Sequence, residues 1–146
     1  MARYSAGGIA SAAATATLPA VTLAAASGSG CRLRQLSIFN TTATSFYATL
    51  RRFSTAQTRG AAVNVHGPAN SPAAACTVAD ANTGTAPTLI NGVVEMAVLP
   101  AAIGGGVIWT FDDTTAELLA GTGNMFGILC PSGTGQVFTY TFHWDE

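Results

Sequence analysis

Apolar and polar residues alternate with a period of two through most of the chain, and this pattern predicts β-strands. The clearest strand is the last segment, QVFTYTFHWDE. Four aromatic residues share one face of that strand: Phe138, Tyr140, Phe142 and Trp144. Because successive side chains of a strand point to opposite faces, Thr139, Thr141 and His143 lie on the other face. We expect Phe138 and Phe142 to pack in the core.

Eight or nine segments carry this pattern between turn-rich stretches, without the regular strand–helix alternation that parallel sheets need. They are residues 15–25, 31–40, 45–53, 61–66, 74–79, 90–99, 106–111, 124–130 and 136–144. They predict an all-β, jelly-roll-like sandwich of two sheets and about eight strands, forming one domain over residues 15–146. Small residues precede it and bury too little to be fixed alone, so we expect a flexible N-terminal arm over residues 1–14.

One predicted strand contains a break in its alternation. In CRLRQLSIFN, Leu33 is out of phase with Leu36 and Ile38. A β-bulge inserts one extra residue and so shifts the alternation by one position. We therefore expect a bulge near Arg34 and Gln35.

Two further segments predict local structure. In DDTTAELLAG, Asp113 or Thr114 could cap a short helix that ends before Gly121. The segment from residue 35 to 53 predicts a hairpin whose return strand ends with Arg51 and Arg52. These two consecutive arginines point to opposite faces, so we expect one at a sheet edge or core rim and the other toward solvent or a partner.

Charge is scarce in this sequence. Only 9% of the 146 residues are charged, against roughly 25% in an average soluble protein, and the formal net charge is −1. Codon bias in a GC-rich genome is one explanation for the many Ala, Gly and Thr residues, but it does not explain why every cation is an arginine. Arginine suits paired or interfacial sites. The chain lacks the basic stripe that nucleic-acid binding needs, so we expect no nucleic-acid partner.

The N-terminal 30 residues imitate a signal peptide, with Arg3 followed by Ala-rich sequence and several A-x-A sites. Their apolar region is mostly Ala, Gly and Thr, so we favour an arm followed by a strand over secretion. No apolar run reaches the roughly 18 residues of a membrane span, so we expect no membrane contact.

No constellation of residues predicts catalysis. The three cysteines, Cys31, Cys76 and Cys130, have no metal-ligand spacing, and we expect them to be reduced and partly buried. His66 and His143 lie in different segments without nearby ligands. Asp112 and Asp113 could bind a cation or share a proton, but a helix cap explains them better. We therefore expect a noncatalytic protein without cofactor or metal.

Three stretches of sequence resemble a known class of protein. They are ARYSAGG, LAAASGSGCRLRQLSIFNTTATSFYATLRRFSTAQTRG and NSPAAACTV, all within roughly the first 80 residues. They resemble capsid decoration or cement proteins encoded among the virion genes of tailed bacteriophages, many of which are predicted β-sandwiches of similar length. The resemblance implies a structural subunit, commonly trimeric, that binds the major capsid protein on the outside of the head, after assembly in the host cytoplasm. It assigns no role to any individual residue.

We expect the contact residues to lie in the arm, the hairpin and the last strand: Arg3, Tyr4, Arg51, Arg52, Tyr140, His143 and Trp144. A net charge near zero favours association, which also predicts a homo-oligomer, with the trimer as the expected form. Two alternatives remain open at this point. The chain could be another virion component, such as a tail or head-fibre protein, or a β-sandwich module that binds a host surface or a carbohydrate.

Overall fold

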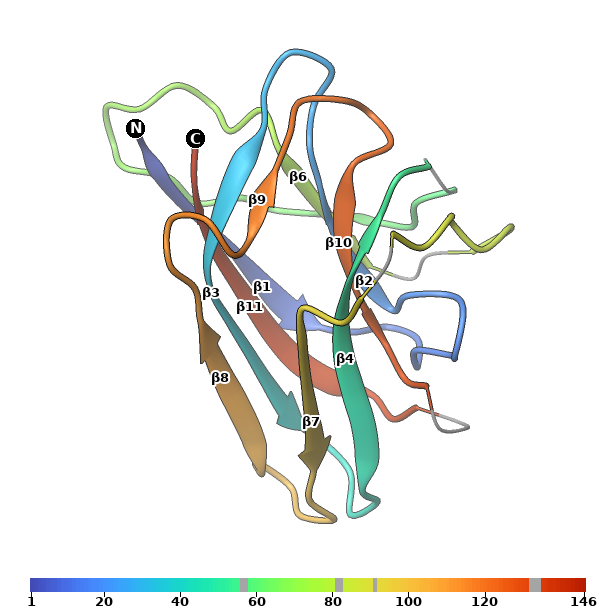
Figure 1. Cartoon of the computed structure of the whole chain (residues 1–146). Coiled ribbons are helices and arrows are strands. Elements are labelled where there is room, and N and C mark those ends of the chain that lie inside the picture. The colour runs from blue at the N-terminus through green and yellow to red at the C-terminus, as the bar shows by residue number, and fades with distance from the viewer. Residues whose placement is uncertain (56–57, 81–82, 91, 132–134) are drawn as a thin grey trace.

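The computed structural model describes residues 1–55, 58–80, 83–90, 92–131 and 135–146. These residues form two antiparallel sheets packed face to face (Figure 1). Sheet A contains, in spatial order, β1 (Arg3–Ile9), β11 (Phe138–Asp145), β3 (Cys31–Asn40) and β8 (Gly106–Thr110), with β9 (Glu117–Leu118) also paired to β3. Sheet B contains β5 (Ala62–Val63), β6 (Thr77–Asp80), β2 (Val21–Ala24), β10 (Met125–Leu129), β4 (Phe46–Phe53) and β7 (Glu95–Leu99). The predicted all-β, jelly-roll-like sandwich is confirmed.

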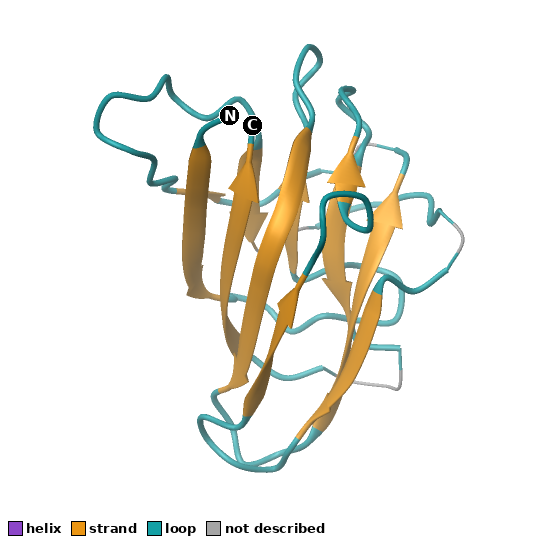
Figure 2. Cartoon of the chain, turned by 60° about the vertical axis from the view of Figure 1, so that its left-hand side comes forward, coloured by secondary structure: helices purple, strands orange, loops and turns teal. Residues whose placement is uncertain are grey.

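The expected flexible arm is corrected by the structure, because residues 3–9 form β1 and pair with β11 along its whole length. Tyr4 and Ala6 of β1 are buried in the core, as is Ala10 just beyond it. The two termini therefore lie side by side at one end of the sandwich (Figures 1 and 2). Ala2 and Glu146 exchange two backbone hydrogen bonds of 2.8 and 3.0 Å. Residues 1–14 thus belong to the same domain as the rest of the chain.

The expected short helix near residue 113 is also absent from the described residues. Residues 113–116 form a turn, and the next two residues form β9 against the start of β3. The last four backbone carbonyl groups of a helix have no intrahelical partner, so a helix of one or two turns leaves most of its backbone groups without intrahelical hydrogen bonds. As part of β9, Glu117 and Leu118 instead pair their backbone groups with β3.

The inner faces of both sheets supply the core. The four aromatic residues predicted to share a face of β11 are all buried: Phe138, Tyr140, Phe142 and Trp144. The ring centroids of Phe138 and Tyr140 lie 6.4 Å apart and those of Tyr140 and Phe142 lie 6.0 Å apart, which is the spacing of favourable aromatic pairs. Leu50, Phe126 and other apolar side chains of sheet B belong to the same core. The prediction that Phe138 and Phe142 are core residues is confirmed.

The predicted bulge in β3 is present. His143 pairs with Gln35, but the next residue, Trp144, pairs with Leu33, so that Arg34 has no partner position on β11. The extra residue keeps Leu33 and Leu36 on the buried face. It also directs the side chain of Arg34 outward, where it contacts charged residues described below.

The two open sides of the sandwich differ. On one side, Ser5 of β1 and His66 exchange two backbone hydrogen bonds of 2.8 Å, which connect the edge of sheet A to the segment after β5 of sheet B. On the other side lie the edge strands β7 and β8, joined by the loop of residues 100–105 at the end of the sandwich away from the termini (Figure 1). In the described part of the chain, β7 pairs only with β4, and β8 only with β3.

Candidate interaction surface

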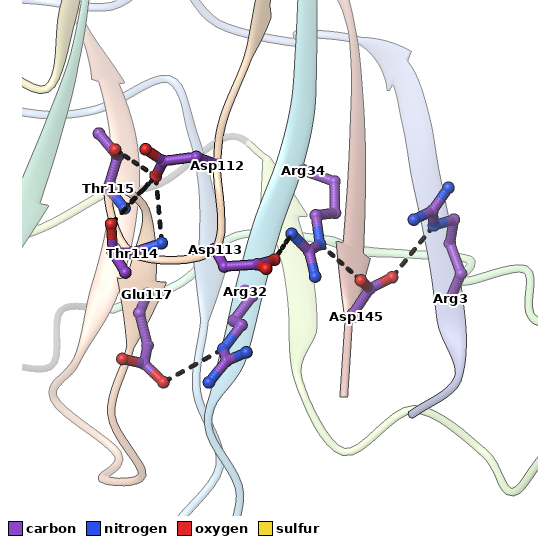
Figure 3. A network of polar contacts seen from close by, with 9 residues as sticks. All are labelled: Arg3, Arg32, Arg34, Asp112, Asp113, Thr114, Thr115, Glu117 and Asp145. Carbon is purple, nitrogen blue, oxygen red and sulfur yellow. Dashed lines mark hydrogen bonds and ion pairs between the residues drawn. The ribbon is translucent and has the colours of Figure 1, made fainter.

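Four charged side chains from separate parts of the chain form one network on the outside of sheet A (Figure 3). Arg3 of β1 donates its Nε–H to Oδ1 of Asp145 at 3.1 Å, and Arg34 donates its Nε–H to Oδ2 of the same carboxylate at 2.5 Å. Arg34 also donates through Nη1 to Asp113. The bulge at Arg34 and the pairing of β1 with β11 place these groups together.

The network stabilises the charged forms of Asp145 and Arg34. Burial alone would raise the pKa of Asp145, but hydrogen bonds from Arg3 and Arg34 hold that pKa below its usual value. Hydrogen bonds to Asp113 and then Asp145 raise the pKa of the Arg34 guanidinium. The ionised form of Asp145 is therefore favoured while it is bound to Arg3 and Arg34.

The adjacent residue Asp112 closes a turn. Its Oδ1 accepts hydrogen bonds from the backbone N–H groups of Thr114 at 3.1 Å and Thr115 at 2.7 Å, and from both threonine hydroxyl groups (Figure 3). The Thr115 side chain and the two backbone groups lower the pKa of Asp112 to about 2. Asp112 and Asp113 thus point to different partners. They do not form a paired acidic site.

The arginines that end the hairpin have contacts on opposite sides of β4, which agrees with the sequence prediction. Arg52 donates from Nη2 to the carbonyl oxygen of Thr115 at 2.9 Å, and its guanidinium carbon lies 5.2 Å from the ring centroid of the core residue Phe126. Arg52 therefore covers the rim of the core. Arg51 donates from Nη1 to the carbonyl oxygen of Gly92 at 3.2 Å.

Arg59 connects two strands of sheet B. It donates to the side-chain and carbonyl oxygens of Thr22 on β2 and of Thr77 on β6, at 2.5 to 3.3 Å. Burial lowers the pKa of its guanidinium. Sequence reasoning missed this contact, because Arg59 follows β4 in a loop whose path the alternation of residues does not determine. With the pair Arg32–Glu117 at 3.4 Å, each of the six arginines has a partner within the chain.

Three of the predicted contact residues are buried, which corrects their assignment to an interface. Tyr4, Tyr140 and Trp144 lie on the inner faces of sheet A. The hydroxyl of Tyr4 donates to the carbonyl oxygen of Pro72 at 2.8 Å, and Nε1–H of Trp144 donates to Oε1 of Glu146 at 2.8 Å. Burial, and secondarily the charge of Asp80, raises the pKa of Tyr140 to about 12.

The other four predicted contact residues reach the surface to different degrees. The side chain of Arg3 is 67% exposed, although its Nε–H is bound to Asp145. His143 is partly exposed between Ser5 and Gln35 on the outer face of sheet A. Arg51 and Arg52 are also partly exposed. The structure does not bring these four side chains together into one site.

Exposed apolar side chains gather where sequence reasoning did not place a contact. We call this surface the open seam: strands β7 and β8, the loop between them and the exposed residues Tyr47, Met96, Val98, Ile103 and Ile108. Val98 lies directly opposite Tyr47 on β4, and Met96 lies opposite Thr49. Met96 and Val98 share the outer face of β7, because successive side chains of a strand point to opposite faces. Both side chains are more than half exposed in the structure.

The three cysteines are free and fully buried, more deeply than expected. A hydrogen bond with Cys76, together with burial, raises the pKa of the Cys31 thiol. Glu146 accepts the backbone N–H groups of Ala75 at 2.8 Å and Cys76 at 2.9 Å. Within the described ranges, no three His, Cys, Asp or Glu side chains are placed to hold a metal ion.

A cavity of about 290 Å³ opens beside the N-terminal end of β3. Its lining includes Cys31, Arg32, Glu117 and Glu146. Arg32 and Glu117 bind each other, and both carboxylate oxygens of Glu146 accept hydrogen bonds from the chain. The charged groups around this cavity are therefore already occupied by internal partners.

The chain matches no known family model, no curated protein and no solved structure. Within the ranges that the structure describes, nothing helical has the length and apolar character that crossing a membrane requires.

Proposed function

We propose that this chain is a noncatalytic virion protein that binds the outer surface of a tailed-bacteriophage head as a decoration or cement subunit and stabilises the head. In this proposal it assembles in the host cytoplasm, and its partners are copies of itself, as a homotrimer, and the major capsid protein. We infer the kind of particle, a tailed-bacteriophage head, from the resemblance of roughly the first 80 residues to such proteins.

The observation that supports this function most is the contrast between charged and apolar side chains on the surface. Every arginine contacts a group within its own chain, while large apolar side chains such as Met96, Val98 and Ile108 are more than half exposed. Exposed apolar patches mark surfaces that contact other proteins. A surface of this kind suits packing into an assembly better than recognition of a charged substrate.

A particle lattice also suits a small subunit with few charged contacts. When copies of the chain are linked in a trimer, the first contact with the head raises the effective concentration of the others. Each individual contact therefore need not be strong. Contacts made mainly by apolar groups are screened little by salt, unlike contacts between exposed charges. We therefore expect binding to heads to persist at high ionic strength.

The experiment is co-sedimentation of the purified protein with expanded heads that lack it, from the phage that encodes it. The proposal predicts saturable binding at both 0.1 and about 1 M salt, where the Debye length falls to about 3 Å, and heads that resist heat better when loaded. Binding to purified tails or to a glycan array, with none to heads, would instead support one of the two alternatives and would refute the decoration function.

A further inference from the structure

We infer that the open seam is the surface through which copies of this chain bind one another. This inference gives a surface to the self-association that the proposed function includes, and it can be tested separately, because self-association can be measured without phage heads. It rests on the unpaired edges of two strands, on the side chains around them and on their low charge.

The first step concerns the backbone. β7 is the outermost strand of sheet B and β8 is the outermost strand of sheet A, on the same side of the sandwich. Among the described residues, neither strand has a hydrogen-bonded neighbour on its outer edge, although β7 and β8 lie close to each other. A strand edge presents unpaired N–H and C=O groups and is a template for pairing with another chain. The opposite side of the sandwich differs, because Ser5 and His66 join the two sheets there.

The second step concerns the side chains. Met96 and Val98 are 58% and 56% exposed on the outer face of β7, and Ile108 is 54% exposed on β8. Residues that point inward at the seam are also incompletely covered, since Ala97 and Val107 pack against the core but remain partly exposed. Some side chains that pack against the core are therefore accessible to solvent along the open seam. A partner placed there would bury both the outer and the inner apolar side chains.

The third step identifies the partner. Proteins protect edge strands with charged residues, proline or bulges, yet β8 contains no charge and β7 contains only Glu95. A strongly charged partner would find only Glu95 along these strands. A second copy brings the same nearly uncharged, apolar edge, and the two strands match in length at five residues each. Because the net charge is only −1, little repulsion opposes the approach of identical copies.

The arrangement of the edges allows a closed assembly. If β7 of one copy pairs with β8 of the next, each copy uses both edges once, and a head-to-tail contact of this kind can close into a ring such as a trimer. If like edges pair about a two-fold axis, the product is a dimer. In either case the seam is covered in every copy.

The experiment is sedimentation velocity on the purified full-length chain at micromolar concentrations, with three lysine variants. Val98→Lys and Ile108→Lys place a charge on the seam, and each should raise the dissociation constant at least about tenfold. Ile9→Lys is the matched control, because Ile9 is 61% exposed on the edge strand of sheet A at the closed side. It should leave the oligomer unchanged. Thermal unfolding of each variant checks that the sandwich is intact.

Hydrogen exchange provides a second measurement that does not require a variant. Amide groups of β7 and β8 should exchange more slowly in the oligomer than in protein diluted below its dissociation constant. A wild-type protein that remains monomeric at micromolar concentration would overturn the inference. An oligomer that Ile9→Lys weakens as much as Val98→Lys and Ile108→Lys do, with no change in exchange at β7 and β8, would also overturn it.

Discussion

Ser5 of β1 and His66 exchange two backbone hydrogen bonds of 2.8 Å across the gap between the two sheets. No comparable bridge joins β7 to β8 on the other side of the described fold. The sandwich is thus closed at one side and open at the other. This asymmetry connects the fold to its proposed role, because the open side also holds the exposed apolar residues Met96, Val98 and Ile108.

The network around Asp145 should contribute more to stability than a surface ion pair. Asp145 is largely buried and binds Arg34 at 2.5 Å, whereas the pair Arg32–Glu117 is well exposed at both ends. We expect Arg34→Ala to lower the free energy of unfolding more than the loss of a surface ion pair does, because it breaks hydrogen bonds to two carboxylates, one of which is the buried Asp145. Arg32→Ala, the matched control, should cost about 0 to 1 kcal/mol.

Urea unfolding monitored by tryptophan fluorescence measures both variants. Equal losses for Arg34→Ala and Arg32→Ala would mean that the buried position of Asp145 adds nothing to the network.

Acid should destabilise the protein through Asp112 and Asp145, whose pKa values are lowered in the folded state. A carboxyl group with a lowered folded pKa stabilises the fold above its unfolded pKa, and this contribution is lost as pH falls through the folded pKa. For Asp112 the loss should occur between its ordinary value of 3.8 and about 2.

The melting temperature measured from pH 6 to pH 2 should therefore fall most steeply below about pH 4. Asp145→Asn should be less stable at pH 6 and show a shallower decline, because the substituted side chain does not titrate. A decline as steep as that of the wild type would exclude Asp145 as a source of acid sensitivity.

Strand β1 is part of the fold, so its removal should unfold the protein. Deleting residues 2–11 removes seven strand pairs with β11 and the buried side chains of Tyr4, Ala6 and Ala10. Tyr4→Ala alone should cost about 3 to 5 kcal/mol, the usual range for truncating a buried aromatic residue. Circular dichroism during heating measures both effects. A deletion variant that melts at the wild-type temperature would show that residues 2–11 form a dispensable arm.

The two neighbouring arginines of β4 should differ in their effect on stability. Arg52→Ala removes a hydrogen bond to Thr115 and a contact with the ring of Phe126, so we expect a loss of about 1 to 2 kcal/mol. Arg51→Ala removes one hydrogen bond to a partly exposed loop and should cost less than about 1 kcal/mol. Chemical unfolding measures the free energy of unfolding of both variants, and each variant is the control for the other. Equal losses of free energy would mean that the surroundings of the two side chains contribute equally to stability.

The sequence predicted those elements whose side chains alternate clearly. β11, β3 and β4 lie within one or two residues of the predicted ranges, and the phase of Leu33 located the bulge. β1 was missed because four of the seven residues of RYSAGGI are Ser, Ala or Gly, which make its apolar–polar alternation weak. The edge strand β7 covers only the second half of its predicted segment, 90–99, and residue 91 of that segment lies outside the described residues.

The proposed contact surface was harder to predict than the fold, for a physical reason. Alternation shows which residues share a face, but not how deeply each of them is covered. Tyr140 and Trp144 were placed at an interface, although they share the face of β11 whose Phe138 and Phe142 were expected in the core, and all four are buried. The exposed apolar face of Met96 and Val98 becomes visible only when the order of strands shows β7 at an edge.

A cryo-EM map of virions from the proposed source, a tailed bacteriophage, would test the proposed function most directly. We predict density for the two-sheet sandwich on the outer surface of the head, with the β7 and β8 side turned toward a neighbouring copy. Density for the sandwich in the tail or in a fibre, or a head surface that lacks it, would contradict the account.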